Sequence, residues 1–316
     1  MRIALLDDYQ QVARDLADWD RLPDGARLTV FNDHLADEDA LVDRLAAFDV
    51  IGVMRERTPL TRSLIERLPD LRLIVTTGTG NASIDVAAAR ERGICVCGTD
   101  SLGFATAEHT MALMLALARN LVGEANSVAR GGWQLGVGRD LRGATLALAG
   151  LGRLGSEVAA LGRAFGMRVI AWSEHLSSAH AAANGVEAVS KDRLLREADY
   201  LSIHLRLSPR TAGLFGAPEF ALMRPRACLI NTSRAPIVDT GALLAALEAG
   251  RPGAAALDVF DIEPLPADSP LRGHPKLLLT PHIGYVTEPT YELFYQGTLE
   301  AILAFDAGRP IREITA

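Results

Sequence analysis

An arginine, a glutamate and a histidine each follow an apolar, strand-like run in the C-terminal half of the chain. Arg234 comes after ACLIN, Glu263 after GAAALDVF, and His282 after KLLLT. Ligands of open α/β sheets bind beyond the carboxyl ends of the strands, so these side chains are expected on one rim. Each residue also has a structural alternative: Arg234 could cap a helix, Glu263 could be a solvated loop residue, and His282 could hydrogen-bond a neighbouring loop.

Their types suit one reaction if a nicotinamide lies on that rim. An arginine binds the carboxylate of a 2-oxo acid with two parallel hydrogen bonds. A histidine gives a proton to the ketone oxygen as hydride arrives and takes it back in the reverse direction. A glutamate beside the ring favours the protonated imidazole. The three residues therefore predict interconversion of a 2-oxo acid and a 2-hydroxy acid.

A glycine-rich turn, GLGRLG at 150–155, supplies the expected dinucleotide site. It lies directly after the strand-like run TLALA and directly before an amphipathic helix, which is the context that a GxGxxG motif requires. Gly150 permits the turn, Gly152 lets a pyrophosphate approach the backbone, and Gly155 lets helix and strand pack closely. The helix N-terminus, at Arg153 and Leu154, offers N–H groups to the phosphates.

The next strand-like run ends in Ser173 and Glu174, about twenty residues after the first glycine, where an acidic side chain binds the adenosine ribose. Ser173 stands where aspartate is commonest, and Glu174 can still reach the ribose. No arginine follows to hold a 2′-phosphate. The pattern favours NAD and leaves NADP as the alternative.

The elements that must position these residues form two series. Short β-rich runs alternate with helical patterns, which predicts an α/β fold of two doubly wound parallel sheets. We predict a domain of residues 1–102 plus 287–316 and a second of residues 103–286. The longest helical pattern, from Thr106 to Arg130, is apolar in its first half and should be buried there. The expected strands are 3–8, 26–31, 48–54, 71–78 and 93–98, then 145–150, 167–172, 200–205, 227–231, 253–260 and 276–280.

Composition excludes several classes of function. The net charge of −7, without a basic stretch, is atypical of a nucleic-acid binder. The longest apolar stretch, 111–118, is too short to cross a bilayer, and the N-terminus does not read as a signal peptide. The three cysteines form no CxxC pair, and neither HExxH nor clustered ligands suggest a metal. We expect a cytoplasmic protein without metal, membrane or nucleic-acid partners.

The residues resemble the D-isomer-specific 2-hydroxyacid dehydrogenase family over essentially the whole chain. The matching stretches, in the family's order, are TTGTGNASIDVAAARERGICV, GLGRLG, INTSRAPIVD, ALDVFDIEPLP and TPHIGY. The resemblance implies a flavodoxin-like substrate domain, a Rossmann NAD domain, a homodimer that pairs through the cofactor domain, and D stereochemistry. It implies a catalytic set of Arg234, Glu263 and His282. It also implies substrate binding by Arg55, Gly78, Thr79 and Gly80, and cofactor-side positions at Thr106, His204, Thr232, Asp258 and Gly284.

Some of these positions have structural alternatives, and the chain departs from the family pattern in places. Either Arg55 or Arg57 could be a surface charge. His204 could be a structural ring whose nitrogens are hydrogen-bonded at a strand end, and Asp258 could be a strand-end residue that hydrogen-bonds the backbone. Tyr285 follows IG where many members have glycine, and with Tyr291 and Tyr295 it could shape a pocket for a larger acyl chain. The competing interpretation is an NAD-sensing, corepressor-like binding protein of the same fold.

Overall fold

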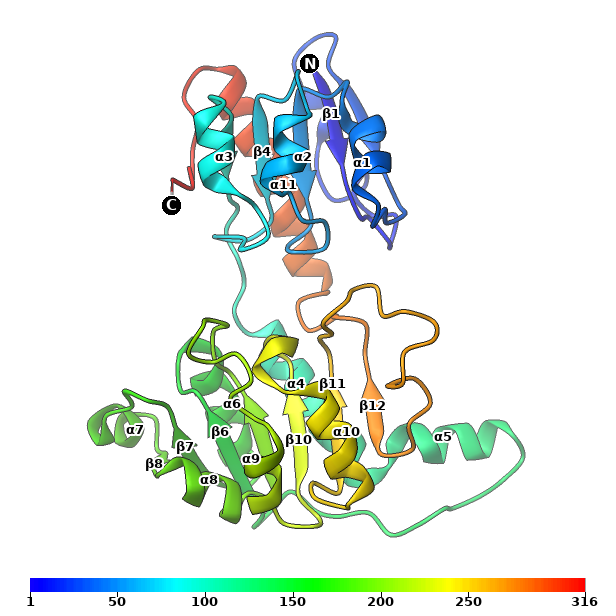
Figure 1. Cartoon of the computed structure of the whole chain (residues 1–316), viewed down its shortest axis with the longest axis vertical. Helices are drawn as coiled ribbons and strands as arrows, with labels where there is room; N and C mark the ends of the chain where they lie inside the picture. The colour runs from blue at the N-terminus through cyan, green and yellow to red at the C-terminus, as the bar shows by residue number, and fades with distance from the viewer. Residues whose placement is uncertain (316) are drawn as a thin grey trace. The chain divides into compact units, whose positions relative to one another are not determined.

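A computed structural model describes residues 1–315, and the chain divides into two compact units (Figure 1). Unit 1 comprises residues 1–102 together with the segment from residue 287 onward, and unit 2 comprises residues 103–286. The sequence-based assignment of substrate binding to the first and of the dinucleotide to the second stays a prediction at this point.

Unit 1 is a five-stranded parallel sheet in the order β2-β1-β3-β4-β5, the flavodoxin-like order that was expected. Its central strands are apolar on both faces and buried, as a sheet covered by helices on both sides requires. Its strands are β1 (Arg2–Leu5), β2 (Arg27–Val30), β3 (Val50–Val53), β4 (Leu73–Thr76) and β5 (Cys95–Cys97), and its helices are α1 (Glu38–Leu45), α2 (Arg62–Glu66), α3 (Val86–Glu91), α11 (Glu288–Asp306) and the short 3-10 helix η1 (Trp19–Arg21).

Unit 2 is a seven-stranded parallel sheet in the order β12-β11-β10-β9-β6-β7-β8. Counted from β6, this is the Rossmann order 3-2-1-4-5-6 with one strand added, so the predicted fold class is confirmed. Its strands are β6 (Thr145–Ala149), β7 (Arg168–Trp172), β8 (Glu187–Ala188), β9 (Tyr200–Ile203), β10 (Cys228–Asn231), β11 (Ala254–Leu257) and β12 (Leu277–Leu279). Its helices are α4 (Ala105–Arg119), α5 (Leu121–Ala129), α6 (Arg153–Ala164), α7 (Ser178–Ala183), α8 (Lys191–Glu197), α9 (Ala217–Leu222), α10 (Thr240–Glu248) and the 3-10 helix η2 (Ala235–Ile237).

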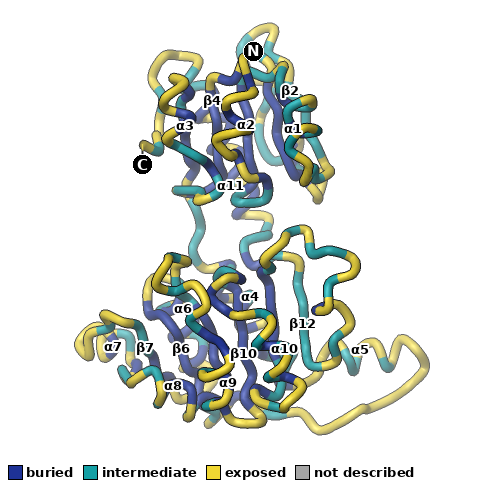
Figure 2. The backbone as a smooth tube through the Cα atoms, viewed as in Figure 1, coloured by how far each residue is buried: buried dark blue, intermediate teal, exposed yellow. Residues whose placement is uncertain are grey.

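Two hydrophobic clusters lie on opposite faces of the unit 2 sheet. Met111 and Met114 of α4 pack with Val158 of α6 on one face. Leu194 of α8, Phe220 of α9 and further residues of α10 pack on the other. The central strands β6, β9 and β10 between them are buried throughout, as the dark-blue tube in Figure 2 shows. A core on both faces leaves the ends of the strands as the place for a ligand.

The structure differs from the sequence prediction in the long helix. The stretch from Thr106 to Arg130 is two helices, because Asn120 adopts the left-handed conformation (φ +47°) and ends α4. Asparagine tolerates this conformation better than most residues, so the break costs little. The first helix is buried as expected, but α5 has no buried residue and projects from unit 2 (Figures 1 and 2). After α11, Glu313 forms an antiparallel bridge with Cys97.

No helix in the part of the chain that the structure describes is both long and apolar enough to span a membrane.

Candidate active site

His282 and Glu263 form a direct pair beyond the strand ends of unit 2. His282 follows β12, Glu263 lies in the loop between β11 and β12, and the distance from Nδ1 to Oε2 is 2.7 Å. The other carboxylate oxygen of Glu263 accepts the N–H of Phe260 at 2.8 Å, which fixes its orientation. Because the glutamate occupies Nδ1, Nε2 is the nitrogen left to meet a substrate.

The backbone at His282 is held in an unusual conformation. Its φ is +53°, in the left-handed region that residues with a Cβ seldom adopt. Asp258, at the end of β11 and buried, accepts the Thr280 hydroxyl at 2.6 Å and the N–H groups of Ile283 and Gly284 at 2.9 and 2.8 Å. These contacts bracket His282 on both sides, so the loop conformation follows from a buried carboxylate.

His109 of α4 joins this cluster, and the sequence prediction missed it. Its Nε2 lies 3.1 Å from Thr280 Oγ1 and 3.3 Å from Asp258 Oδ1. Burial acts to raise the pKa of Asp258, but hydrogen bonds from His109 and Thr280 hold the pKa below its ordinary value. A histidine inside an otherwise apolar helix was the signal that could have revealed the contact. Asp258 is thus tied to the backbone, the structural alternative considered for it.

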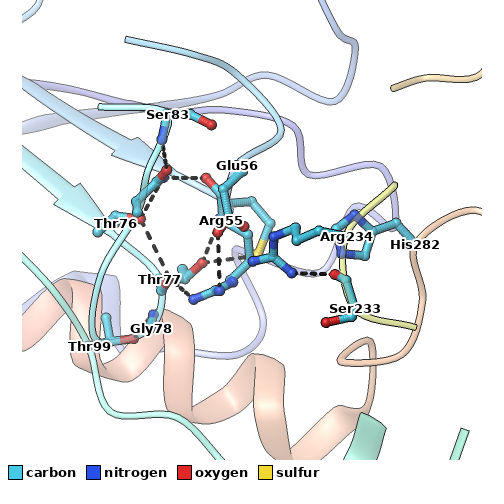
Figure 3. A network of polar contacts seen from close by, with 12 residues as sticks. Arg55, Glu56, Thr76, Thr77, Gly78, Ser83, Thr99, Ser233, Arg234 and His282 are labelled. Carbon is cyan, nitrogen blue, oxygen red and sulfur yellow. Dashed lines mark hydrogen bonds and ion pairs between the residues drawn. The ribbon is translucent and has the colours of Figure 1, made fainter. Parts of the chain in front are cut away.

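Arg234 lies in the turn that follows β10. The buried Asn231 at the strand end shapes this turn, because its side chain donates to the Arg234 carbonyl at 3.0 Å and accepts the Ser233 N–H at 3.0 Å. The guanidinium of Arg234 donates to the Ser233 carbonyl at 2.7 Å, as Figure 3 shows. Arg234, Glu263 and His282 therefore follow β10, β11 and β12, which are neighbours in the sheet.

The glycine-rich turn has the geometry that the motif requires. Gly150 has φ +100°, and a Cβ there would lie 2.5 Å from the His204 carbonyl oxygen of β9's end. A Cβ on Gly155 would lie 2.3 Å from the Gly150 oxygen, so α6 and β6 approach as closely as glycine allows. Among the described residues other than its chain neighbours, none has an atom within 4 Å of a Cβ on Gly152, the N-cap of α6. The open position and the helix N-terminus fit a pyrophosphate.

Arg210, which the sequence analysis did not single out, lies beside Glu174, the residue predicted to bind the adenosine ribose. Glu174 is exposed, and its Oε2 lies 3.4 Å from Nη1 of Arg210, which comes from the segment after β9. No arginine follows Glu174 directly in the sequence, but Arg210 lies beside it in space. Ser173 lies beside Glu174 at the end of β7.

Three further residues predicted to lie beside the cofactor make contacts within the protein. Ser202 Oγ and His204 Nε2 are 2.9 Å apart, and burial lowers the pKa of His204 to about 4, so this ring is neutral at neutral pH. The hydroxyls of Thr232 and Thr110 are 2.9 Å apart. Arg153 lies against Gly103, since a Cβ on that glycine would be 2.9 Å from its guanidinium.

The predicted substrate residues of unit 1 lie together at the ends of β3 and β4. Arg55 has φ +53°, its N–H donates to Thr77 Oγ1 at 2.8 Å, and its guanidinium donates to the Thr77 carbonyl at 3.1 Å (Figure 3). The guanidinium lies on Gly78, where a Cβ would come within 2.0 Å of it. The Gly78 N–H donates to Thr99 Oγ1 at 2.7 Å, whereas Thr79 and Gly80 are more open.

Tyr285, one of the three tyrosines expected near a pocket, lies beside His282. Its ring meets the His282 ring edge-on, with centroids 5.4 Å apart. Tyr291 and Tyr295 are buried in unit 1, where their hydroxyls donate to Gln10 at 3.2 Å and to Asp8 at 3.3 Å. Arg57 also donates to the Tyr291 oxygen.

A Rossmann sheet with this glycine turn, and an Arg, Glu and His set at adjacent strand ends, defines a dinucleotide-dependent oxidoreductase fold. Residues 111–284 match the family model for the D-isomer specific 2-hydroxyacid dehydrogenase, NAD binding domain. The chain belongs to the D-isomer specific 2-hydroxyacid dehydrogenases, and its cofactor is NAD(H).

Relatives with assigned activities include enzymes for different acids. The chain is 42% identical over 257 residues to the glyoxylate reductase of Aeropyrum pernix, covering 78% of this chain and 76% of that protein. It is 39% identical over 255 residues to the D-3-phosphoglycerate dehydrogenase of Methanocaldococcus jannaschii, covering 79% of this chain. The chain spans 48% of that dehydrogenase, about half its length.

A solved structure of a phosphoglycerate oxidoreductase from Vibrio cholerae matches the fold with a TM-score of 0.92 at 38% identity. The match covers 98% of this chain and 99% of that one, so both units have counterparts there.

Proposed function

We propose that the protein reduces a small 2-oxo acid to the D-2-hydroxy acid with NADH and catalyses the reverse oxidation with NAD. The observation that carries the proposal is the 2.7 Å pair of His282 Nδ1 and Glu263 Oε2 beyond the strand ends of a dinucleotide-binding sheet. When bound, the nicotinamide supplies or accepts the hydride. The protein's part is to orient the acid and to move one proton.

His282 is the proton donor in the direction of reduction. Its Nδ1–H is directed to Glu263, so Nε2–H is the group that faces the ketone oxygen. The carboxylate of Glu263, fixed by the Phe260 N–H, stabilises the imidazolium from which the proton leaves. In the oxidative direction neutral Nε2 accepts the hydroxyl proton of the 2-hydroxy acid.

Arg234 orients the acid beside the histidine. Its guanidinium carries five N–H donors in a planar fork, which matches the carboxylate and carbonyl oxygens of a 2-oxo acid. The Asn231 turn holds its backbone at the end of β10. Replacement by lysine would keep the charge and lose the fork.

Unit 1 supplies the second carboxylate contact in this proposal. Arg55 is fixed on Thr77 and Gly78, and the adjacent amides of Thr79 and Gly80 complete a polar loop. The Gly78 N–H is already bound to Thr99, so Thr79 and Gly80 are the amides that we assign to the substrate. On this basis unit 1 is the substrate-binding domain and unit 2 the NAD domain.

The substrate class follows from relatives named glyoxylate reductase, glycerate dehydrogenase and phosphoglycerate dehydrogenase. The test is NADH absorbance at 340 nm with glyoxylate, hydroxypyruvate, pyruvate and a branched 2-oxo acid, followed by chiral analysis of the product. The proposal expects turnover of at least one acid to the D product. NADH binding without turnover of any of them would favour the corepressor-like alternative.

We also propose a homodimer formed through residues 121–137 of unit 2, which comprise the projecting helix α5 and the segment after it. The support is a set of large apolar side chains that unit 2 leaves in solvent, with Trp133 73% and Val137 100% exposed. Apolar exposure of this extent is typical of an interface. Sedimentation of the wild type and of a Trp133→Ser, Val137→Ser variant tests it, and a monomeric wild type would refute it. The other exposed members of the set are Leu121, Val122, Val128 and Leu135.

A further inference from the structure

His109, on helix α4, contacts Thr280 and Asp258, the two residues that hold the His282 loop in place. Its Nε2 is within 3.1 Å of Thr280 Oγ1 and 3.3 Å of Asp258 Oδ1, and its side chain is only 16% exposed. Thr280 has one hydroxyl proton, and it donates this proton to Asp258 at 2.6 Å. Nε2 must therefore carry the proton that faces both oxygens, so His109 is a hydrogen-bond donor at this site.

The same helix meets the loop a second time, one turn earlier. A Cβ placed on Gly284 would lie 3.0 Å from Asp258 Oδ2 and 3.3 Å from Thr106 Cγ2. The helix thus packs directly on the loop backbone. Thr106 and His109 are three residues apart and share one helix face. Their contacts fall at residues 284 and 280, on either side of His282.

Asp258 fixes the loop only while its carboxylate keeps one orientation. Oδ1 accepts hydrogen bonds from the Thr280 hydroxyl and the Ile283 N–H, and Oδ2 accepts one from the Gly284 N–H. The His109 donor restrains Oδ1 and the Thr280 hydroxyl together. The left-handed backbone of His282 depends on these contacts, because residues with a Cβ keep this conformation only where their surroundings impose it.

We propose that His109 is a positioning residue for His282 and acts through Thr280 and Asp258. This inference rests on the proposed function, in which His282 transfers the proton. Loss of the His109 donor frees the loop, and the His282 ring then leaves the orientation in which Nδ1 meets Glu263. Misplacement of a reacting group by about 1 Å can cost about 100-fold in rate. We expect dinucleotide binding at the glycine-rich turn to change much less.

The test compares His109→Leu, which removes the donor, with His109→Gln, whose side-chain amide can donate at a similar reach. His109→Leu is expected to lower kcat about 10- to 100-fold and to leave the NADH dissociation constant, measured by fluorescence, within about twofold. His109→Gln is expected to recover most of the loss. Equal kcat values for wild type and His109→Leu would overturn the proposal, as would a variant that loses NADH affinity and kcat together.

A second readout does not depend on turnover. The Nδ1–H proton of His282, which faces Glu263, is expected to give a downfield NMR signal, and His109→Leu is expected to weaken or remove it. If the wild type turns over no 2-oxo acid but this signal responds, the positioning role stands and the proposed function fails. If His109→Leu does not fold, Thr280→Val removes the bridging hydroxyl instead, and an unchanged signal in that variant refutes the role.

Discussion

Replacing Glu263 with glutamine tests the proton-transfer pair with little change in shape. The distance from His282 Nδ1 to Glu263 Oε2 is only 2.7 Å. The side chain of Glu263 is 26% exposed and that of His282 19%, so solvent screens the pair weakly. A hydrogen bond to a charged partner is worth about 1.5–3 kcal/mol, and a neutral one about 0.5–1.5 kcal/mol. The substitution therefore removes about 1–2 kcal/mol of support for the imidazolium, which lowers kcat/KM about 5- to 30-fold.

The assay is NADH oxidation with the best acid of the panel, under saturating cofactor. Glu248→Gln is the matched control, because Glu248 also faces a histidine nitrogen, His274 Nε2 at 3.1 Å, but is 74% exposed. Exposed pairs contribute at most about 1 kcal/mol, and this pair is remote from the chemistry, so the control is expected to retain wild-type kcat/KM. If Glu263→Gln matches the wild type as well, the pair has no role in proton transfer.

Three further predictions concern the cofactor domain. Gly155→Ala is expected to lower the melting temperature, because its Cβ would meet a backbone oxygen at 2.3 Å. Gly152→Ala is expected to leave the melting temperature unchanged and to weaken NADH binding. Equal effects of the two variants in calorimetry and in NADH titration would contradict the assigned roles. Because burial lowers the pKa of His204 to about 4, the unfolded state takes up the extra proton as pH falls from about 6.5 to 4. The free energy of unfolding should drop by roughly 3 kcal/mol over that range, and urea titrations should show no such component in His204→Gln. Glu174→Gln releases Arg210 to bind a 2′-phosphate, so the affinity for NADPH should rise relative to that for NADH. Adding Arg210→Gln should cancel this gain. Titrations that show no rise in NADPH affinity would count against the pairing of Arg210 with Glu174.

Much of the fold was predictable because apolar runs in parallel sheets leave a strong signature. All the described strands except β8 overlap runs identified in the sequence, and the buried first half of α4 was expected from its composition. The break at Asn120 was not predictable from periodicity, because the helical pattern continues through it and one backbone angle decides the outcome. The short α7 and β8 lack an apolar run long enough to detect.

The site divides in the same way. Residues directly behind strands, such as Arg234, were placed by the rule for open sheets. Contacts between distant segments were not predicted. His109 of α4 contacts Asp258 at the end of β11, and Arg210 after β9 contacts Glu174 after β7. Such partners are far apart in sequence, so spacing carries no information about them.

The central claim is that His282 transfers the proton while the glycine-rich turn, separately, binds the dinucleotide. Single-turnover reduction of the best acid by His282→Ala, together with a fluorescence titration of NADH, tests it most directly. The account predicts unchanged NADH affinity and a hydride-transfer rate lower by a factor on the order of 10²–10⁴. Transfer at the wild-type rate would contradict the account.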